Sequence, residues 1–342
     1  MYQASLEKYT LDFKQPSGTS RGVLTQKNSW FIRIWKTNQP EIVGIGEASI
    51  IENLSPEWNV AYTHFIESVV ANINAYVQQE IKGLANYPSI YFAIEMALRD
   101  LEHGGKQVYY PSAFTSDEAP IGINGLIWMG TKEFLLEQIN AKIATGFTCI
   151  KMKIGAIDFE TELAVLHFIR RKYPKDQIEL RVDANGAFST KDAHEQLEQL
   201  AEFDLHSIEQ PIKAGQIEAM ANLCANTPLP IALDEELIGI TNYDEKKALL
   251  ERIKPQYIIL KPSLLGGFEA SDEWIEIAEN LNIKWWITSA LESNIGLNAI
   301  AQYTFTKNNP LPQGLGTGQL YTNNTPSPLT IEKGQLYLKK TD

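Results

Sequence analysis

Cysteine is nearly absent from this sequence, and its scarcity argues against two kinds of protein. The 342 residues include only two cysteines, Cys149 and Cys224, which lie in different segments. Neither their number nor their spacing fits a disulfide framework or a zinc site. A hydrophobic content of 44% is ordinary for a globular protein with a large core.

Long apolar runs and an excess of basic residues are also lacking. No stretch approaches the roughly 18 apolar residues of a membrane span, and residues 1–10 lack the pattern of a signal peptide. The sequence has 30 Lys and Arg residues against 42 Asp and Glu residues, a net charge of −12. This charge disfavours nucleic acids and anionic membranes as partners. We expect a cytoplasmic protein, and the sequence does not indicate its oligomeric state.

Strand patterns followed by helical patterns fill the first third of the chain. Strands are predicted over residues 6–13, 29–35 and 44–51. A polar loop is expected over residues 15–22, a helical region over 56–79 and an amphipathic helix over 89–101. This order is typical of an α+β domain, which we place at residues 1–115.

From residue 119 onward, strand and helix patterns alternate strictly. The predicted strands are residues 120–123, 148–153, 178–183, 207–209, 231–234, 257–261, 285–288 and 313–315. Such a succession of βα units predicts a parallel barrel. We place the barrel at residues 116–319 and expect residues 320–342, which alternate again, to return to the first domain.

Residues 149–155 (CIKMKIG) carry the first chemical signal. Alternate side chains of a strand point to opposite faces, so Lys151 and Lys153 share one face. Taken alone, the segment also fits an edge strand with a solvated lysine face. The later strands favour a functional site, because three of them end in an isolated acid and a fourth ends in a lysine.

The charged strand ends are Asp183, Glu209, Asp234 and Lys261. The carboxyl ends of the strands form the active-site face of a TIM-type barrel, so these groups and Lys153 should meet at one mouth. Three neighbouring carboxylates repel one another unless a cation lies between them. Oxygen ligands suit a hard cation, so we predict Mg²⁺, with Mn²⁺ as a substitute.

This combination suits the removal of a proton next to a carboxylate of a small-molecule substrate. A metal ion on the carboxylate oxygens stabilises the enediolate, and a neutral lysine takes the proton. Neighbouring cations, among them Lys151, lower a lysine's pKa and make the base available. Each of these residues alone has a common structural explanation, such as a helix cap. Their recurrence at the ends of successive strands favours a catalytic site instead.

With these residues in view, the chain resembles the enolase superfamily, in its muconate-lactonizing branch, over nearly its whole length. The similar motifs are KMK with Lys151 and Lys153, RVDANGAF with Asp183, IEQP with Glu209, LDEE with Asp234 and LKPSLLGG with Lys261. The resemblance implies an α/β fold, a (β/α)₇β TIM-type barrel with an α+β capping domain. It also implies that the three acids bind the metal ion.

Three further segments, residues 123–130, 288–297 and 314–318, are similar to the succinylbenzoate-forming members of this branch. The resemblance implies a lyase of menaquinone biosynthesis that dehydrates 2-succinyl-6-hydroxy-2,4-cyclohexadiene-1-carboxylate to 2-succinylbenzoate. In that reaction Lys153 would remove the α-proton and then protonate the departing hydroxyl. Lys261 would stay charged and stabilise the ring by a cation–π contact.

Small and polar groups are the predicted substrate contacts. Ser289, Ser293 and Gly316 offer hydroxyl and backbone N–H donors to the succinyl tail, and Lys151 adds positive charge. The segments 15–22 and 48–55 are expected to close over the tail, with Arg21 as a candidate partner for a carboxylate.

An epimerase or racemase of the same branch, acting on dipeptides or N-acyl amino acids, is the main alternative, because lysines stand on both faces of the site. The dipeptide epimerases that this chain resembles usually carry an Asp-x-Asp pair at strand eight to hold the α-ammonium. This chain has Leu315-Gly316-Thr317-Gly318 there, without an acid. A barrel that only binds a ligand is a third possibility, but a binding protein would have no need of the base.

Overall fold

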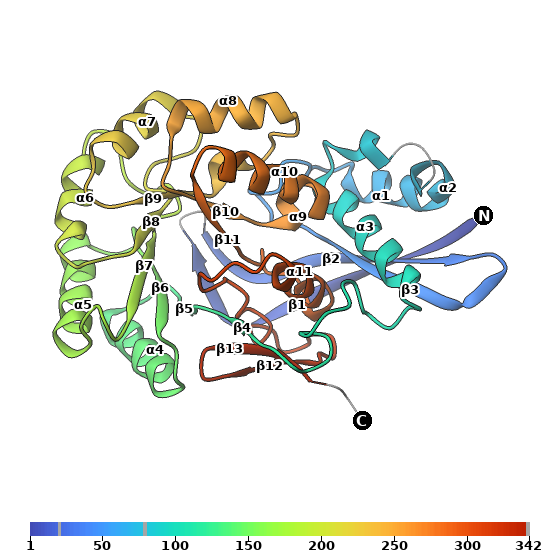
Figure 1. The fold of residues 1–342 in the computed structure, drawn as a ribbon, viewed down its shortest axis with the longest axis horizontal. Helices are drawn as coiled ribbons and strands as arrows, with labels where there is room; N and C mark the ends of the chain where they lie inside the picture. The colour runs from blue at the N-terminus through green and yellow to red at the C-terminus, as the bar shows by residue number, and fades with distance from the viewer. Residues whose placement is uncertain (20–21, 78–80, 340–342) are drawn as a thin grey trace.

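The computed structural model describes residues 1–19, 22–77 and 81–339. A ring of parallel strands wrapped by helices lies on the left of Figure 1, and a capping unit of long antiparallel strands and helices lies on the right. This architecture confirms the predicted TIM-type barrel with a capping domain. No helix among these residues is long and apolar enough to cross a membrane.

Parallel strands form the wall of the barrel in chain order. They are β5 (Gly125–Ile127), β6 (Cys149–Lys153), β7 (Glu179–Asp183), β8 (Ser207–Glu209), β9 (Ile231–Leu233), β10 (Tyr257–Leu260) and β11 (Lys284–Ile287). The segment at Gln313 and Gly314 closes the ring, because it bridges Ile123 on one side and Thr288 on the other. This segment corresponds to the predicted eighth strand, residues 313–315.

Helices cover the outside of the barrel (Figure 1). They are α4 (Lys132–Ala144), α5 (Phe159–Lys172), α6 (Ala193–Ala201), α7 (Ile217–Asn226), α8 (Tyr243–Ile253), α10 (Gly267–Asn280) and α11 (Asn294–Thr306), and the short α9 (Pro262–Leu265) follows β10. Local sequence fixes their ends. In α5, the Asp158 side chain accepts a hydrogen bond from the Thr161 nitrogen at the start, and basic residues occupy the last turn.

The cap is built on a three-stranded antiparallel sheet. Its elements are β1 (Tyr2–Thr19), β2 (Gly22–Lys36), β3 (Gln39–Ser49), α1 (Tyr62–Ala71), α2 (Ile73–Ala75), the 3₁₀ helix η2 (Ile81–Leu84) and α3 (Pro88–Glu102). Two glycines let α3 lie directly on β3. A Cβ added at Gly46 would stand 1.8 Å from the carbonyl oxygen of Ala93, and one at Gly44 would stand 1.9 Å from that of Ala97.

Two predicted boundaries are wrong. Residues 15–19 belong to β1 rather than to a loop, because Ser17 pairs with Leu24 and Thr19 with Gly22. Arg21 lies outside the described residues. The first barrel strand is β5, and the residues predicted for it instead contribute the short β4 (Ile121–Gly122), which pairs with β13. A displacement of four to five residues is not visible in the apolar pattern, because apolar residues recur from Ile121 to Ile127.

The end of the chain makes contacts in two places. The Leu320 carbonyl accepts a 2.8 Å hydrogen bond from the Lys14 nitrogen of β1, and Tyr321 bridges Phe13. The hairpin of β12 (Leu329–Glu332) and β13 (Gln335–Leu338) pairs with β4 beside the barrel. The division at residues 115 and 320 stays a prediction.

Glu95 of α3 ties the cap to the barrel. Its Oε2 accepts a 2.6 Å hydrogen bond from the backbone nitrogen of Phe268, at the start of α10. The side chain is only 12% exposed. Burial raises the pKa of Glu95 to about 7, although the Phe268 N–H and the Arg99 guanidinium favour the charged form.

We expect Glu95 to make the protein less stable as pH rises from 4.5 to about 7. The unfolded chain releases this proton near 4.5 whereas the folded chain keeps it until about 7, so the folded state holds more protons in this window. The free energy of unfolding should fall by up to about 1.4 kcal/mol per pH unit from this group. Chemical denaturation at pH values from 4.5 to about 7 should show that the free energy of unfolding falls less steeply with pH in Glu95→Gln than in the wild type. The glutamine oxygen keeps an acceptor for the Phe268 N–H. Glu102→Gln, an exposed change at the end of the same helix, is the control, and a slope for Glu95→Gln equal to the wild type would contradict the prediction.

Candidate active site

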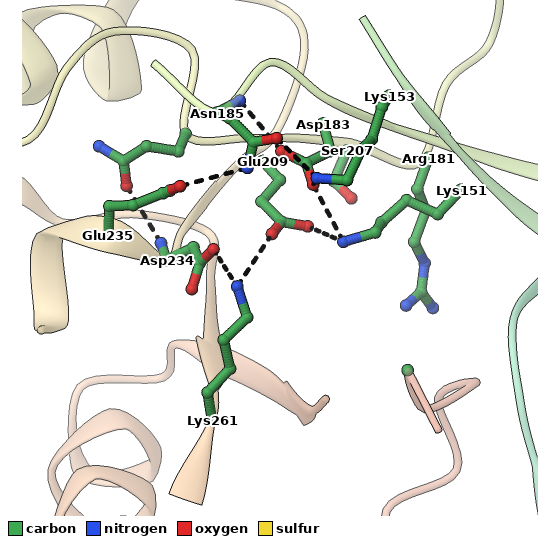
Figure 2. Close-up of polar contacts among 12 residues, drawn as sticks. Lys151, Lys153, Arg181, Asp183, Asn185, Ser207, Glu209, Asp234, Glu235 and Lys261 are labelled. Atoms are coloured by element: carbon green, nitrogen blue, oxygen red, sulfur yellow. Dashed lines mark hydrogen bonds and ion pairs between the residues drawn. The ribbon is translucent and has the colours of Figure 1, made fainter. Parts of the chain in front are cut away.

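Strand register brings the charged residues together at one mouth of the barrel. Lys153 of β6 pairs with Asp183 of β7, and Asp183 pairs with Glu209 of β8, so the three side chains lie side by side in one row. Asp234 follows β9 directly and Lys261 follows β10. Figure 2 shows the ammonium groups pointing toward the carboxylates from different strands.

Each carboxylate of this group is paired with at least one ammonium. Lys151 Nζ lies 3.2 Å from Asp183 Oδ2 and 2.5 Å from Glu209 Oε2, and Lys153 Nζ lies 3.0 Å from Asp183 Oδ2. Lys261 forms an ion pair with Asp234 and lies 3.8 Å from Glu209 Oε1. The carboxylates are each 1% exposed. These side chains therefore form a buried cluster of three acids and three bases whose formal charges cancel.

Burial and opposite charges compete in this cluster, and the outcome differs between residues: burial raises the pKa of Asp234 well above its ordinary value although Lys261 favours its charged form, whereas opposite charges prevail at Lys151, Lys261 and Asp183. Burial lowers the pKa of Lys151, but Glu209 and Asp183 outweigh burial and the net shift is upward. The same balance, with Asp234 and Glu209 as the partners, raises the pKa of Lys261. Burial raises the pKa of Asp183, but Lys153 and Lys151 hold it below its ordinary value. Lys151 and Lys261 are thus kept as cations, which suits electrostatic roles.

The acids have the chemistry of a metal site, although their present arrangement is one of ion pairs. Within the described parts of the chain, no three His, Cys, Asp or Glu side chains lie close enough to share a metal ion. Figure 2 shows that Lys151 bridges Asp183 and Glu209, and that Lys261 bridges Glu209 and Asp234. Glu209 Oε1 is buried and has no hydrogen-bond partner among the described residues; Lys261 Nζ is 3.8 Å away. A hard cation would satisfy this oxygen, so the donor set fits Mg²⁺.

Asn185 is a site residue that the sequence did not single out. Its Oδ1 accepts a 2.6 Å hydrogen bond from Lys153 Nζ, and its Nδ2 donates a 3.2 Å bond to Glu235 Oε1. Its backbone has a φ of 46°, and its nitrogen donates a 3.0 Å bond to Asp183 Oδ1. The Asp-Ala-Asn-Gly sequence resembles an ordinary turn, and that turn chemistry is what aims the Asn185 amide at Lys153.

A cavity of about 270 Å³ opens beside the cluster. Lys151, Lys153, Asp183 and Lys261 form its charged side. Apolar side chains from the cap and the barrel cover much of the rest, namely Val23, Leu24, Ile51, Leu54, Leu126, Trp128, Ala290 and Leu291. Of the two predicted closing segments, 48–55 therefore supplies several lining residues, and Gly22 lines the cavity at the end of the other.

The predicted substrate contacts separate into two groups. Ser289 and Gly316 line the cavity, and the Ser289 hydroxyl lies 2.7 Å from that of Thr317. Ser293 is fully buried at the start of α11, where its Oγ donates to Glu47 Oε2 of the cap and accepts from the Ile295 nitrogen. These contacts give Ser293 a part in joining the cap to the barrel, and its place in substrate binding stays a prediction without support from this geometry.

Comparison with known proteins agrees with the site. A family model described as enolase C-terminal domain-like matches residues 135–341. The o-succinylbenzoate synthase of Desulfotalea psychrophila is 48% identical over 93% of this chain and 94% of that protein. The crystal structure of MenC from Desulfotalea psychrophila LSv54 superposes with a TM-score of 0.84 at 45% identity, covering 98% of this chain and 99% of that one.

A more distant structure matches the fold alone. The substrate-liganded L-Ala-D/L-Glu epimerase of Bacillus subtilis has a TM-score of 0.82 at 19% identity, over 98% of this chain and 95% of that one. Fold and sequence together define an enzyme of the enolase superfamily. The chain belongs to this superfamily, and its similarity within the superfamily is to the o-succinylbenzoate synthases. The predicted family is confirmed.

Proposed function

We propose that this chain is a lyase, an o-succinylbenzoate synthase of menaquinone biosynthesis. It would remove water from 2-succinyl-6-hydroxy-2,4-cyclohexadiene-1-carboxylate to give 2-succinylbenzoate. The carrying observation is the pairing of Lys153 and Lys261 with three buried carboxylates at the mouth of a cavity whose wall at Gly314, Gly316 and Thr317 carries no acid. The similarity to a synthase at 48% identity supports this substrate, and a cytoplasmic location stays a prediction.

Lys153 is the base in this proposal. Asp183 and Asn185 hold its Nζ at 3.0 and 2.6 Å, so the amine has a fixed direction toward the cavity. The neutral amine takes the proton from C1 of the ring, and the electron pair left behind moves into the substrate carboxylate. As the C6 hydroxyl leaves with its bonding pair, the same amine returns a proton to it as water. A double bond forms between C1 and C6, and the ring becomes aromatic.

Lys261 acts through its charge. It comes from β10 and approaches the carboxylates from another side than the β6 lysines, as Figure 2 shows. The carboxylates of Asp234 and Glu209 keep it protonated. A fixed cation beside the substrate stabilises the negative charge that develops after proton removal, at no cost of reorganisation.

Asp183, Glu209 and Asp234 are the proposed holders of a Mg²⁺ ion, with Mn²⁺ as a substitute. Bound there, the ion would supply positive charge beside the substrate carboxylate. With Lys153 as the neutral base, three acids face two lysine cations, Lys151 and Lys261, so a divalent cation would add charge of the sign that the acids need.

Removal of divalent metal should abolish turnover, and added Mg²⁺ should restore it. Asp234→Asn removes a charged oxygen ligand, so calorimetric titration should show Mg²⁺ affinity at least about tenfold weaker than in the wild type. Asp176→Asn, an exposed change in the loop before β7, should leave the affinity unchanged. Full activity after exhaustive chelation would rule the metal site out.

Replacing Lys153 and replacing Lys261 should impair the reaction in different ways. Lys153→Ala should lower kcat by about 10²- to 10⁴-fold and stop exchange of the substrate α-proton with deuterated solvent, because the base is lost. Lys261→Ala should lower kcat by about 10²- to 10³-fold because a stabilising charge is lost. Exchange measured by mass spectrometry separates the roles. If exchange survives in Lys153→Ala and disappears in Lys261→Ala, the assignments are reversed.

Product analysis tests the function itself. Purified protein with Mg²⁺ should convert the cyclohexadiene to 2-succinylbenzoate and should act on L-Ala-L-Glu with a kcat/KM lower by roughly 10⁴-fold. The reason is that Gly316 and Thr317 offer no carboxylate to a buried ammonium, and mismatches of this kind discriminate strongly. Comparable efficiency on the dipeptide, with slow or absent dehydration, would favour the epimerase alternative.

A further inference from the structure

The aromatic side chain of Trp128 lies beside the proposed base. In the parallel neighbours β5 and β6, Ile127 pairs with Met152. The residues that follow this pair, Trp128 and Lys153, therefore stand next to each other, and both line the cavity. Lys153 Nζ lies over the Trp128 ring, 5.9 Å from its centroid. At a separation of up to about 6 Å, the face of an indole ring attracts an ammonium group.

Gln138 of α4 holds the backbone of Trp128 with two hydrogen bonds. Trp128 comes directly after the last residue of β5. The Gln138 side chain accepts a 3.0 Å bond from the Trp128 nitrogen through Oε1 and donates a 3.0 Å bond to the Trp128 carbonyl through Nε2. An amide that satisfies both backbone groups of one residue acts like a neighbouring strand. It therefore fixes the position from which the indole ring extends into the cavity.

The connection from Trp128 to α4 is short and closely packed. It consists of residues 129–131, and its last residue, Thr131, accepts a hydrogen bond from the Phe134 nitrogen at the start of the helix. A Cβ added at Gly130 would stand 2.4 Å from Cδ1 of Phe134, so the connection passes directly over the first turn. Trp128 and α4 are thus joined both by this connection and by the Gln138 side chain.

Trp128 completes the surroundings of Lys153 Nζ from the side of β5. On the side of β7, Asp183 Oδ2 and Asn185 Oδ1 contact this nitrogen at 3.0 and 2.6 Å. In the proposed reaction Nζ begins as a neutral amine and takes a proton from the substrate, so positive charge develops on it. The ring face favours the ammonium over the amine. A contact that is stronger in the transition state than in the ground state raises kcat.

We propose that Trp128 is a positioning residue that directs Lys153 Nζ toward the substrate and stabilises the ammonium that forms there, and that Gln138 acts through Trp128. This inference rests on the proposed function, because it takes Lys153 as the base. It gives a part in the reaction to a residue of the segment 123–130 and to a helix residue that sequence patterns did not indicate.

The first test compares replacements of the ring. Trp128→Leu should lower kcat for dehydration by about three- to thirtyfold, because the contact with the developing ammonium is lost. Trp128→Phe keeps an aromatic face, so its kcat should stay within about threefold of the wild type. Equal losses in the two variants would show that the shape of the side chain matters rather than its ring, and an unchanged kcat in Trp128→Leu would also overturn the proposal.

The second test asks whether Gln138 acts through the ring. Gln138→Met has a similar length but no amide, so it should lower kcat by about three- to tenfold. Calorimetry should show an unchanged affinity for 2-succinylbenzoate, because Gln138 is not among the described residues that line the cavity. In the Trp128→Leu background, Gln138→Met should cause no further loss of kcat. If Gln138→Met does not fold, the comparison of the two Trp128 variants still tests the proposal.

Gln216→Met is the matched control. The Gln216 side chain also contacts the backbone of a βα loop, since its Nε2 donates a 3.1 Å hydrogen bond to the Lys213 carbonyl after β8. This variant should leave kcat unchanged. Multiplied losses in the double variant of Trp128 and Gln138 would show that Gln138 acts independently of the ring. An affinity loss in Gln138→Met as large as its loss of kcat would show a role in binding. Either result would overturn the proposal.

Failure of the proposed function would be distinguishable from failure of this inference. A wild type that does not dehydrate the cyclohexadiene would reject the proposed function. In that case, exchange of the α-proton of L-Ala-L-Glu with deuterated solvent, measured by mass spectrometry, reports on the same lysine. Slower exchange in Trp128→Leu and Gln138→Met than in Gln216→Met would leave the inference standing, and equal exchange in all three variants would reject it.

Discussion

The burial of three carboxylates at one barrel mouth is the constraint on which the site depends. Charges of one sign so close together, each 1% exposed, are strongly unfavourable unless cations lie among them. Lysines at β6 and after β10 supply those cations in this structure. The same acids are the proposed metal ligands, so a bound metal ion and the lysines act on the same oxygens. A bound metal ion would weaken the ion pair between Asp183 and Lys153. Lys153 could then release its own proton and act as a neutral base.

The cap completes this site because polar and apolar contacts fix it on the barrel. Glu47 of β3 accepts hydrogen bonds from Ser29 in the cap and from both the nitrogen and the hydroxyl of Ser293 in the barrel. A small apolar cluster also joins Ile51 of the cap to Leu264 and Ala290 of the barrel. These contacts join the cap segment that lines the cavity to the loop after β11. The cavity is thus formed by both units, and its apolar part comes largely from residues that carry no chemical signal in the sequence.

Sequence alone predicted the barrel and its charged residues because both have a regular spacing. Strand ends recur once per βα unit, and the charged residues at five successive ends, Lys153, Asp183, Glu209, Asp234 and Lys261, are visible without any structure. The predictions were wrong where contacts between residues far apart in the sequence determine the strand boundaries and the partners of a side chain. Whether residues 120–123 or Gly125–Ile127 form the first barrel strand depends on pairing with β13, which lies more than 200 positions later. Ser293 offers the same hydroxyl as Ser289, and only the position of Glu47 shows that this hydroxyl is already bonded.

The two walls of the cavity have opposite characters, and this difference limits what the enzyme can bind. The charged wall suits a carboxylate that loses an adjacent proton, a feature shared by synthases, epimerases and racemases of this superfamily. Discrimination among them must therefore come from the other wall. Gly314, Gly316 and Thr317 supply backbone and hydroxyl groups there, without a negative charge. An ammonium group placed against such a wall would lose its hydration without gaining a counter-ion, whereas a ketone or a carboxylate would find donors. In the proposed reaction, proton transfer would take place at strands β6 to β10, and the closing segment of the barrel would select the substrate.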